Sequence, residues 1–188
     1  MQVSGDDRLT GGQVRSLDER GGYDDFAAAS VGRLLRMAYL LTGSTHDAAD
    51  LTQDTLERLF VSWWRIKADP MAYAFKTMVN LAHNRRRWRR RHVETALDLV
   101  AEPADDDRSD QILSRAEIVS ALQQLPPRQR AVIVLRYLED LPEAHTAAAL
   151  NISPGTVKSQ SAKALTRLRQ ILVAVDAATD FAGDGGVA

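Results

Sequence analysis

The chain contains no cysteine at all. Disulfide bonds, zinc–thiolate sites and thiol redox switches of its own are therefore excluded, which fits a reducing compartment. The N-terminal segment lacks the basic-then-apolar pattern of a secretory signal, and no apolar run is long enough to cross a bilayer. We therefore expect a cytoplasmic protein without membrane insertion.

Signatures of catalysis are missing as well. The four histidines (His46, His83, His92 and His145) show no metal-ligand spacing. Neither a phosphate-binding glycine loop nor a serine in a nucleophile-elbow motif occurs. The sequence predicts no catalytic residue, no metal ligand and no cofactor, so it favours a binding protein over an enzyme.

Overall charge is also nearly absent, because the formal net charge is only -1. Its distribution is uneven, however: six arginines fill residues 85–91, a second basic group lies between Lys158 and Arg169, and acidic residues gather between the two. A helix end accommodates some positive charge, but not at the density of residues 85–91. Such clusters neutralise phosphates, so the sequence indicates nucleic-acid binding at two separate places.

Helical spacing of apolar residues dominates the chain. The first predicted helix runs from Phe26 to Leu41 and ends at Gly43, and Ser44 caps the next. Asp69 and Pro70 open a third helix as N-cap and first helical position. Apolar residues on the second helix form a core-facing stripe (Leu51, Thr55, Leu56, Leu59, Phe60 and Trp63).

The predicted fold class is all-α, with two small helical domains joined by a flexible acidic linker. The length and the 45% hydrophobic content are sufficient to give each domain a core. The expected segments are a flexible N-terminal tail (1–22), a first domain (23–92), the linker (93–110), a second domain (111–175) and a flexible C-terminal tail (176–188).

The second domain carries a predicted helix-turn-helix from Glu143 to about Gln170. Ala147 and Ala148 supply small residues where two helices approach, and Asn151 suits a left-handed turn. Ser153 and Pro154 then begin the recognition helix. A plain bundle of amphipathic helices is the alternative, but the cap, the turn and the polar first half of the last helix favour the motif. Its candidate DNA-facing residues are Thr156, Lys158, Ser159, Ala162, Lys163 and Thr166.

Two polar stripes mark the first domain. One follows the second helix through Asp50, Gln53, Asp54 and Glu57, and the other follows the third helix through Lys76, Asn80, His83 and Arg87. Tryptophans could stack on the bases of an opened strand. Trp63 is expected in the core, whereas Trp64 and Trp88 fit either role.

Several of these segments together resemble a known family, the bacterial RNA polymerase sigma factors of the extracytoplasmic-function (ECF) group within the sigma-70 family. A short loop before Pro70 and the segment 39–43 are similar to an actinobacterial, SigE-like subgroup. The resemblance covers about Phe26 to Leu172. Its motifs are residues 47–53, similar to region 2.2; residues 69–73 and 79–82, similar to regions 2.3 and 2.4; and residues 125–130 and 153–159, similar to region 4.

The resemblance implies a transcription initiation factor that binds core RNA polymerase and directs it to promoters. Implied partners are the beta-prime clamp helices and beta flap of the polymerase, promoter DNA and an anti-sigma factor. The implied core-polymerase-binding residues are Asp50, Gln53 and Asp54. The implied minus-ten DNA-binding residues are Lys67, Lys76, Asn80, His83 and Arg87. The implied minus-35 DNA-binding residues are Thr156, Lys158, Ser159, Ala162 and Lys163.

Two other readings remain open at this point. A stand-alone regulator could bind operator DNA as a dimer through the helix-turn-helix, using the region 26–59 as its dimer face. An RNA-binding structural protein could use the arginine run alone, without dependence on Lys158 or Lys163.

Overall fold

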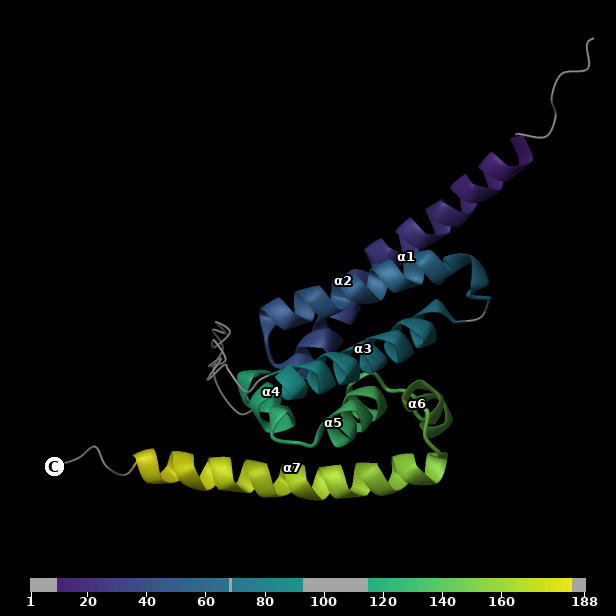
Figure 1. The fold of residues 1–188 in the computed structure, drawn as a ribbon. Helices are drawn as coiled ribbons and strands as arrows, with labels where there is room; N and C mark the ends of the chain where they lie inside the picture. Colours follow the sequence, from purple (N-terminus) through teal and green to yellow (C-terminus); the bar gives the residue numbers. More distant parts are fainter. Residues whose placement is uncertain (1–9, 68, 93–114, 184–188) are drawn as a thin grey trace, which may run out of the picture.

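The computed structural model describes residues 10–67, 69–92 and 115–183, and side chains within 22–67, 69–85 and 116–174. All regular elements in these ranges are helical (Figure 1). They are α1 (Thr10–Thr42), α2 (Thr45–Ser62), η1 (Trp63–Arg65), α3 (Pro70–His92), α4 (Arg115–Gln123), α5 (Pro127–Ile133), η2 (Val134–Leu138), α6 (Glu143–Leu150) and α7 (Pro154–Gly183). The all-α prediction is confirmed. No helix in the described ranges has the length and apolar character needed to span a membrane.

Local capping chemistry sets several helix ends as predicted. The Ser44 side chain accepts a hydrogen bond from Asp47 N at 3.3 Å, and Asp69 Oδ1 accepts one from Met71 N at 2.9 Å. Gly43 closes α1 with a φ of +76°, a left-handed conformation that glycine adopts without steric cost. Each predicted start or stop at these positions is therefore confirmed.

Both outer helices are longer than predicted. α1 begins at Thr10 and not near Phe26, so residues 10–22 are helical and not a flexible tail. α7 likewise continues to Gly183 through the segment expected to be the C-terminal tail. Once a turn exists, each further residue adds one backbone hydrogen bond, and no proline interrupts either extension. Residues 1–9, 184–188 and the predicted linker 93–110 lie outside the described ranges.

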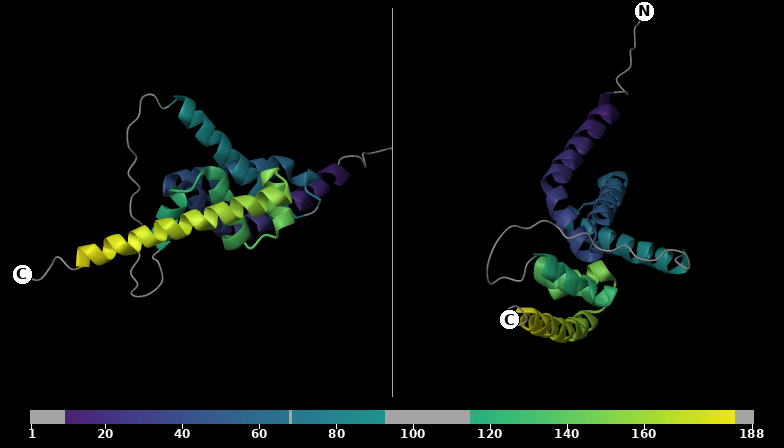
Figure 2. Two further views of the ribbon diagram at one scale, coloured as in Figure 1. Left: turned by 90° about the horizontal axis from the view of Figure 1, so that it is seen from below. Right: turned by 90° about the vertical axis from the view of Figure 1, so that its left-hand side faces the viewer.

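The first half of the molecule, α1 to α3, is a bundle around Leu34, Met37, Leu51, Phe75 and Met78, all buried. Its second half is formed by α4 to α7, with α7 running along α4, α5 and α6 (Figure 1). The halves are not separate: one hydrophobic core joins apolar side chains of α1 and α3 to those of α4, α5, η2, α6 and α7. Both α1 and α3 contact the second half, which lies below them in the right-hand view of Figure 2.

The helix-turn-helix is formed by α6 and α7. Asn151 has φ 52° and ψ 49°, which confirms the left-handed turn. Ala147 is buried against Val132 and Val157, as predicted, but Ala148 is exposed. Helical geometry explains the error, because adjacent residues point about 100° apart and only one can face the contact. Ala149, not Ala148, is the second buried alanine.

Candidate DNA-reading and polymerase-binding surfaces

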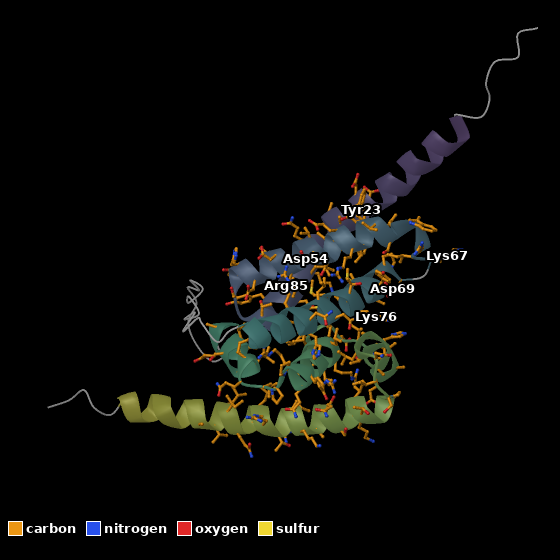
Figure 3. The ribbon with its side chains drawn as sticks, viewed as in Figure 1. Tyr23, Asp54, Lys67, Asp69, Lys76 and Arg85 are labelled. Atoms are coloured by element: carbon orange, nitrogen blue, oxygen red, sulfur yellow. The ribbon has the colours of Figure 1, made fainter. Side chains whose placement is uncertain are left out.

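The polar stripe of α2 lies at the surface. Gln53 and Glu57 are exposed and bonded to each other at 2.9 Å, whereas Asp50 and Asp54 are half-buried. Arg85 of α3 donates to Asp54 Oδ2 at 2.7 Å and to the backbone oxygen of Asp50 at 3.2 Å (Figure 3). The first arginine of the basic run is thus bound to the acidic stripe of the neighbouring helix.

The polar stripe of α3 faces outward as well. Lys76, Asn80 and His83 are all exposed on this helix, which the Asp69 cap and Pro70 begin. Lys67 is exposed just before α3 (Figure 3). Arg87 belongs to α3, but its side chain lies outside the described part of the chain, as do those of residues 86–92.

A groove of about 510 Å³ runs between the end of α2 and the start of α3. It joins the predicted Lys76 and Asn80 to Glu57 of the α2 polar stripe and to residues for which the sequence analysis gave no DNA-binding role: Arg58, Val61, Ser62, Tyr73 and Thr77. Tyr73 is 38% exposed and Val61 is exposed, so an aromatic ring and an apolar surface border the groove. The signal was present, because Tyr73 precedes Lys76 by three residues and Asn80 by seven on the same helical stripe.

Trp63 was expected in the core, but its side chain is half-buried. Trp63 packs against Tyr23 and Phe26, with ring centroids 5.5 and 5.3 Å away. Trp64 is 61% exposed and lies under the Arg65 guanidinium at 4.3 Å. Phe60 was assigned to the core stripe but is 49% exposed, and its ring lies edge-on to Tyr23 with the centroids 5.1 Å apart. Trp88 lies outside the described side chains.

The start of α7 presents the polar side chains predicted to face DNA. Ser153 Oγ accepts a hydrogen bond from Thr156 N at 3.1 Å, which fixes the first turn. Thr156 is half-buried, and the other five predicted residues are exposed: Lys158, Ser159, Ala162, Lys163 and Thr166. Val157, Ser161 and Ala164 are buried on the opposite face. This distribution is what a helix needs to pack on one side and enter a major groove with the other.

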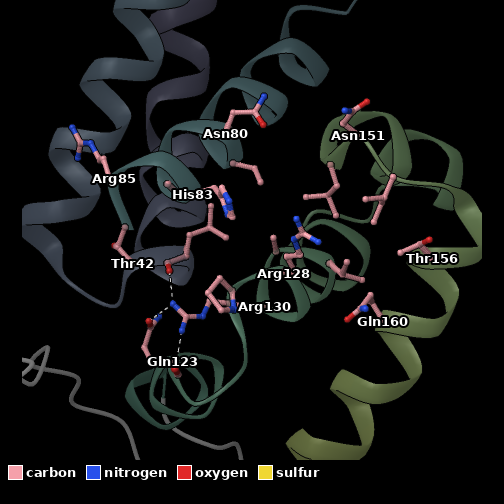
Figure 4. Close-up of a pocket in the computed structure, with 18 of the residues that line it drawn as sticks. Thr42, Asn80, His83, Arg85, Gln123, Arg128, Arg130, Asn151, Thr156 and Gln160 are labelled. Atoms are coloured by element: carbon pink, nitrogen blue, oxygen red, sulfur yellow. Dashed lines mark hydrogen bonds between the residues drawn. The ribbon is translucent and has the colours of Figure 1, made fainter. Parts of the chain in front are cut away.

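A second cavity, of about 580 Å³, lies between the two halves (Figure 4). Asn80 and His83 of α3 border it on one side, and Arg128, Thr156 and Gln160 border it on the other. The structure therefore brings members of the predicted minus-ten and minus-35 sets around one cavity. The described part of the chain contains no group of three histidine, aspartate or glutamate residues able to hold a metal ion.

Family models match both halves of the chain. Residues 27–92 match sigma-70 region 2, and residues 115–168 match sigma-70 region 4. Region 2 thus contains the α2 stripe and the α3 groove, and region 4 contains the helix-turn-helix.

Similar proteins point to the same family. An RNA polymerase sigma-E factor of Streptomyces coelicolor is 37% identical over 155 residues, which are 82% of this chain and 88% of the relative. The ECF RNA polymerase sigma factor SigE of Mycolicibacterium smegmatis is 34% identical over 80% of this chain and 61% of its own length.

A solved structure shares the fold. The sigma factor RpoE of Bartonella quintana, in complex with the anti-sigma factor NepR, has a TM-score of 0.71 and 23% identity over 80% of this chain and 96% of its own. The two family models and the identity to these relatives establish that the chain belongs to the sigma-70 family, as an RNA polymerase sigma factor of the ECF group, SigE-like in type.

Proposed function

We propose that this chain is the specificity subunit of RNA polymerase: it binds the core enzyme through α2, reads the minus-35 element with α7 and holds the opened minus-ten strand at α3. The observation that carries the proposal is the presence of both surfaces, a polar-faced recognition helix in region 4 and a groove with Tyr73, Lys76 and Asn80 in region 2.

The proposed polymerase contact is the α2 stripe. Asp50, Gln53 and Asp54 line one side of a helix whose opposite side is committed to the core through Leu51, Thr55 and Leu59. An exposed acidic and amide stripe suits a partner surface that supplies donors. The Arg85–Asp54 pair leaves Asp50 and Gln53 more accessible to such a partner than Asp54.

The proposed minus-ten site is the groove along α3. An unstacked base needs a flat apolar surface for stacking and donors or acceptors for its edge. Tyr73 and Val61 offer the first, and Lys76 and Asn80 offer the second. Lys67 and His83 are exposed before and after the groove residues in the sequence, and we propose that they and Arg87 follow the strand beyond the groove.

The proposed minus-35 site is the exposed face of α7. Lys158 and Lys163 supply phosphate contacts, which set register, while Thr156, Ser159 and Ala162 face base edges in the major groove. The alternative of a stand-alone dimeric regulator is not favoured, because the sigma-70 region 2 match to residues 27–92 extends over the region such a regulator would use as its dimer face.

In this proposal the polymerase alone catalyses RNA synthesis. We infer that the chain supplies recognition and strand trapping without being an enzyme, that it acts in the cytoplasm, and that an anti-sigma factor holds it. The last inference follows from the solved structure of the same fold, the sigma factor RpoE in complex with the anti-sigma factor NepR.

Charge reversal on α2 tests the polymerase contact. Asp50→Arg is expected to reduce both co-purification with core polymerase and the amount of promoter-dependent transcript. The introduced arginine would repel a polymerase surface that supplies hydrogen-bond donors to the α2 stripe. Glu143→Arg, the same change at an exposed position of α6, is the matched control and is expected to retain both. Full recruitment and transcription by Asp50→Arg would refute the assignment.

The double change Lys158→Ala and Lys163→Ala tests the DNA contact of α7. Recruitment to core polymerase should persist, while transcript from a promoter with both elements should fall and its dependence on salt should weaken. A protein that used only the arginine run would lose nothing in this variant.

A further inference from the structure

The cavity between α3 and the helices α5 to α7 has the size of a small-molecule site. Its volume is about 580 Å³, and pockets that hold small ligands measure about 300–1,000 Å³. Residues of α3, α5, α7 and the turn between α6 and α7 line it (Figure 4). Among the described residues, Asn80 alone lines both this cavity and the α3 groove, so the two spaces are distinct.

The lining of the cavity favours an anion. Its described part contains one acidic residue, Asp47, against four basic ones: His83, Arg85, Arg128 and Arg130. Arg85 is bonded to Asp54, and Arg130 is bonded to backbone carbonyls at helix ends. The described residues supply no hydrogen-bond or ion-pair partner for Arg128 or His83, and both side chains point into the cavity (Figure 4). These two side chains are therefore available to a ligand.

Side-chain amides and apolar groups complete the lining. Asn80 of α3, Asn151 of the turn and Gln160 of α7 each offer hydrogen-bond donors and an acceptor. Asn151 is fixed by its left-handed backbone, with φ 52° and ψ 49°. The apolar side chains that line the same space are Val79, Ala82, Val132, Leu150 and Ile152. Proteins bind an unstacked nucleobase in such surroundings, where polar groups read its edge and apolar groups cover its faces.

A nucleotide with a single phosphate meets both requirements. A guanidinium binds a phosphate through two parallel hydrogen bonds, and Arg128 is the one guanidinium of the described lining that has no protein partner. We propose that this cavity binds a nucleoside monophosphate. Its phosphate lies at Arg128 and His83, and its base lies against the apolar side chains and the amides of Asn80 and Gln160. This site goes beyond the proposed function, which requires no small ligand.

A bound nucleotide competes with promoter DNA. Asn80 and His83 are proposed to contact the minus-ten strand and Thr156 the minus-35 element, and all three line the cavity. A nucleotide in the cavity therefore covers side chains that promoter DNA needs. This consequence, unlike the site itself, rests on the proposed function.

Calorimetric titration of the full-length protein tests the ligand class, with adenosine 5′-monophosphate (AMP) as the probe. AMP is expected to bind at one site per chain. Adenosine should bind about ten-fold more weakly, because it lacks the charged group that Arg128 holds. Inorganic phosphate should also bind more weakly than AMP, because it lacks the base. Absence of AMP binding, or adenosine or inorganic phosphate that binds as tightly as AMP, would overturn the proposal.

Substitutions locate the bound nucleotide. Arg128→Ala should weaken AMP binding about ten-fold and Gln160→Ala about three-fold, because they remove a charged and a neutral hydrogen bond. Arg128 is exposed and Gln160 is half-buried, so both variants should keep the fold. Arg36→Ala, at an exposed arginine of α1 outside the lining, is the matched control and should bind AMP as the starting protein does. Unchanged AMP binding by Arg128→Ala would overturn the site.

Tyr73→Ala separates this cavity from the α3 groove, because Tyr73 lines only the groove. AMP binding should be unchanged in this variant. If Tyr73→Ala weakens AMP binding and Arg128→Ala does not, the nucleotide lies in the groove. That result would overturn the cavity site and favour the proposed minus-ten site.

Competition with DNA is measured separately, by the fluorescence anisotropy of a labelled promoter duplex. At an AMP concentration about ten times its Kd, the apparent affinity of the full-length protein for the duplex should fall about ten-fold. The same AMP concentration should have a much smaller effect on Arg128→Ala. AMP binding without competition would leave the cavity site in place and count against the proposed DNA contacts of Asn80, His83 and Thr156. Absence of AMP binding overturns the site and leaves the proposed function untouched.

Discussion

At the scale of single residues, Arg130 shows how burial turns a charged side chain into a structural one. Its five described hydrogen bonds all go to oxygen atoms at the ends of helices or the loop after α4. Carbonyls in the last turn of a helix lack intrahelical donors, and a buried polar group that loses its partner costs about 1–3 kcal/mol. The residue therefore stabilises the fold, although it stands in the segment 125–130, which has two basic residues and is similar to region 4.

Replacement of Arg130 should lower stability sharply. We expect Arg130→Ala to reduce the free energy of unfolding by about 3 kcal/mol, because several carbonyls are orphaned at once. Arg130→Lys should recover little of this loss, since an ammonium cannot reproduce the planar fork. Urea unfolding followed by circular dichroism measures both. Arg128→Ala, two residues away and exposed, is the control and should stay within about 0.5 kcal/mol of the starting protein.

Tyr23 makes stability depend on alkaline pH. Burial raises the pKa of its phenol above the ordinary value of 10.0, and the charges of Asp24 and Glu57 raise it further. The hydroxyl donates to Leu56 O at 3.0 Å, which also favours the protonated form. The folded state thus keeps a proton that the unfolded chain releases, so this contribution is complete below about pH 10 and falls as the pH rises toward the folded pKa.

Tyr23→Phe tests this linkage. The variant should lose about 1 kcal/mol at about pH 8 through the missing hydrogen bond, and its stability should then decline less steeply as the pH rises above about 10. Tyr137→Phe, at an exposed tyrosine, is expected to change neither quantity. Equal pH slopes for Tyr23→Phe and the starting protein would contradict the prediction.

At the scale of elements, the proposed binding of a base in the α3 groove depends on one aromatic side chain, Tyr73. Stacking of a base on an aromatic ring contributes about 1–3 kcal/mol. Tyr73→Ala should therefore shorten the lifetime of the open promoter complex by about ten-fold or more, whereas Tyr73→Phe should retain most of it. Permanganate reactivity of the opened strand and complex lifetime against competitor DNA are the measurements. Tyr137→Ala removes another exposed tyrosine, on η2, and should leave the lifetime unchanged.

Helix ends were predictable where residues close in sequence determine them. Ser44, Asp69 and Ser153 each accept a hydrogen bond from a backbone amide two or three residues onward, so short sequence motifs suffice to place these helix starts. Gly43 and Asn151 mark left-handed ends for the same reason. The exposure of a residue at the edge of an apolar stripe depends on neighbouring helices and not on local sequence. Phe60 fits the helical spacing of the apolar stripe, yet its side chain is 49% exposed.

The positions of the candidate site residues were predictable to the same degree, whereas their roles stay predictions. Lys76, Asn80 and the α7 residues follow from helical spacing together with the family resemblance. Predicting the groove beside them would have required the relative positions of α2 and α3. Helical spacing on α3 does not reveal that Val61 and Ser62 of α2 line the same groove. The contacts Leu40–Gln123, Leu41–Arg130 and Arg33–Glu139 join residues separated by 83, 89 and 106 positions, which no periodicity reaches.

At the scale of the whole molecule, a shared core predicts shared stability. Apolar side chains of α1 and α3 pack against those of α4 to α7 in one cluster, and hydrogen bonds from Gln123 and Arg130 to the end of α1 join the same elements. When one half unfolds, the folded state of the other half loses these contacts and becomes less stable. The protein should therefore unfold in one cooperative transition. Two helical domains linked only by a tether would unfold separately.

The tryptophans make this testable without any label. Trp63, Trp64 and Trp88 all belong to the first half, so their fluorescence follows that half alone, whereas far-ultraviolet circular dichroism follows helices in both. The two probes should give coincident urea curves for the starting protein. Arg33→Glu should separate the curves, because the interface loses the Arg33–Glu139 ion pair, and Arg36→Glu should not. Separate curves for the starting protein would mean that the halves are energetically independent, and the shared core would then contribute nothing to their coupling.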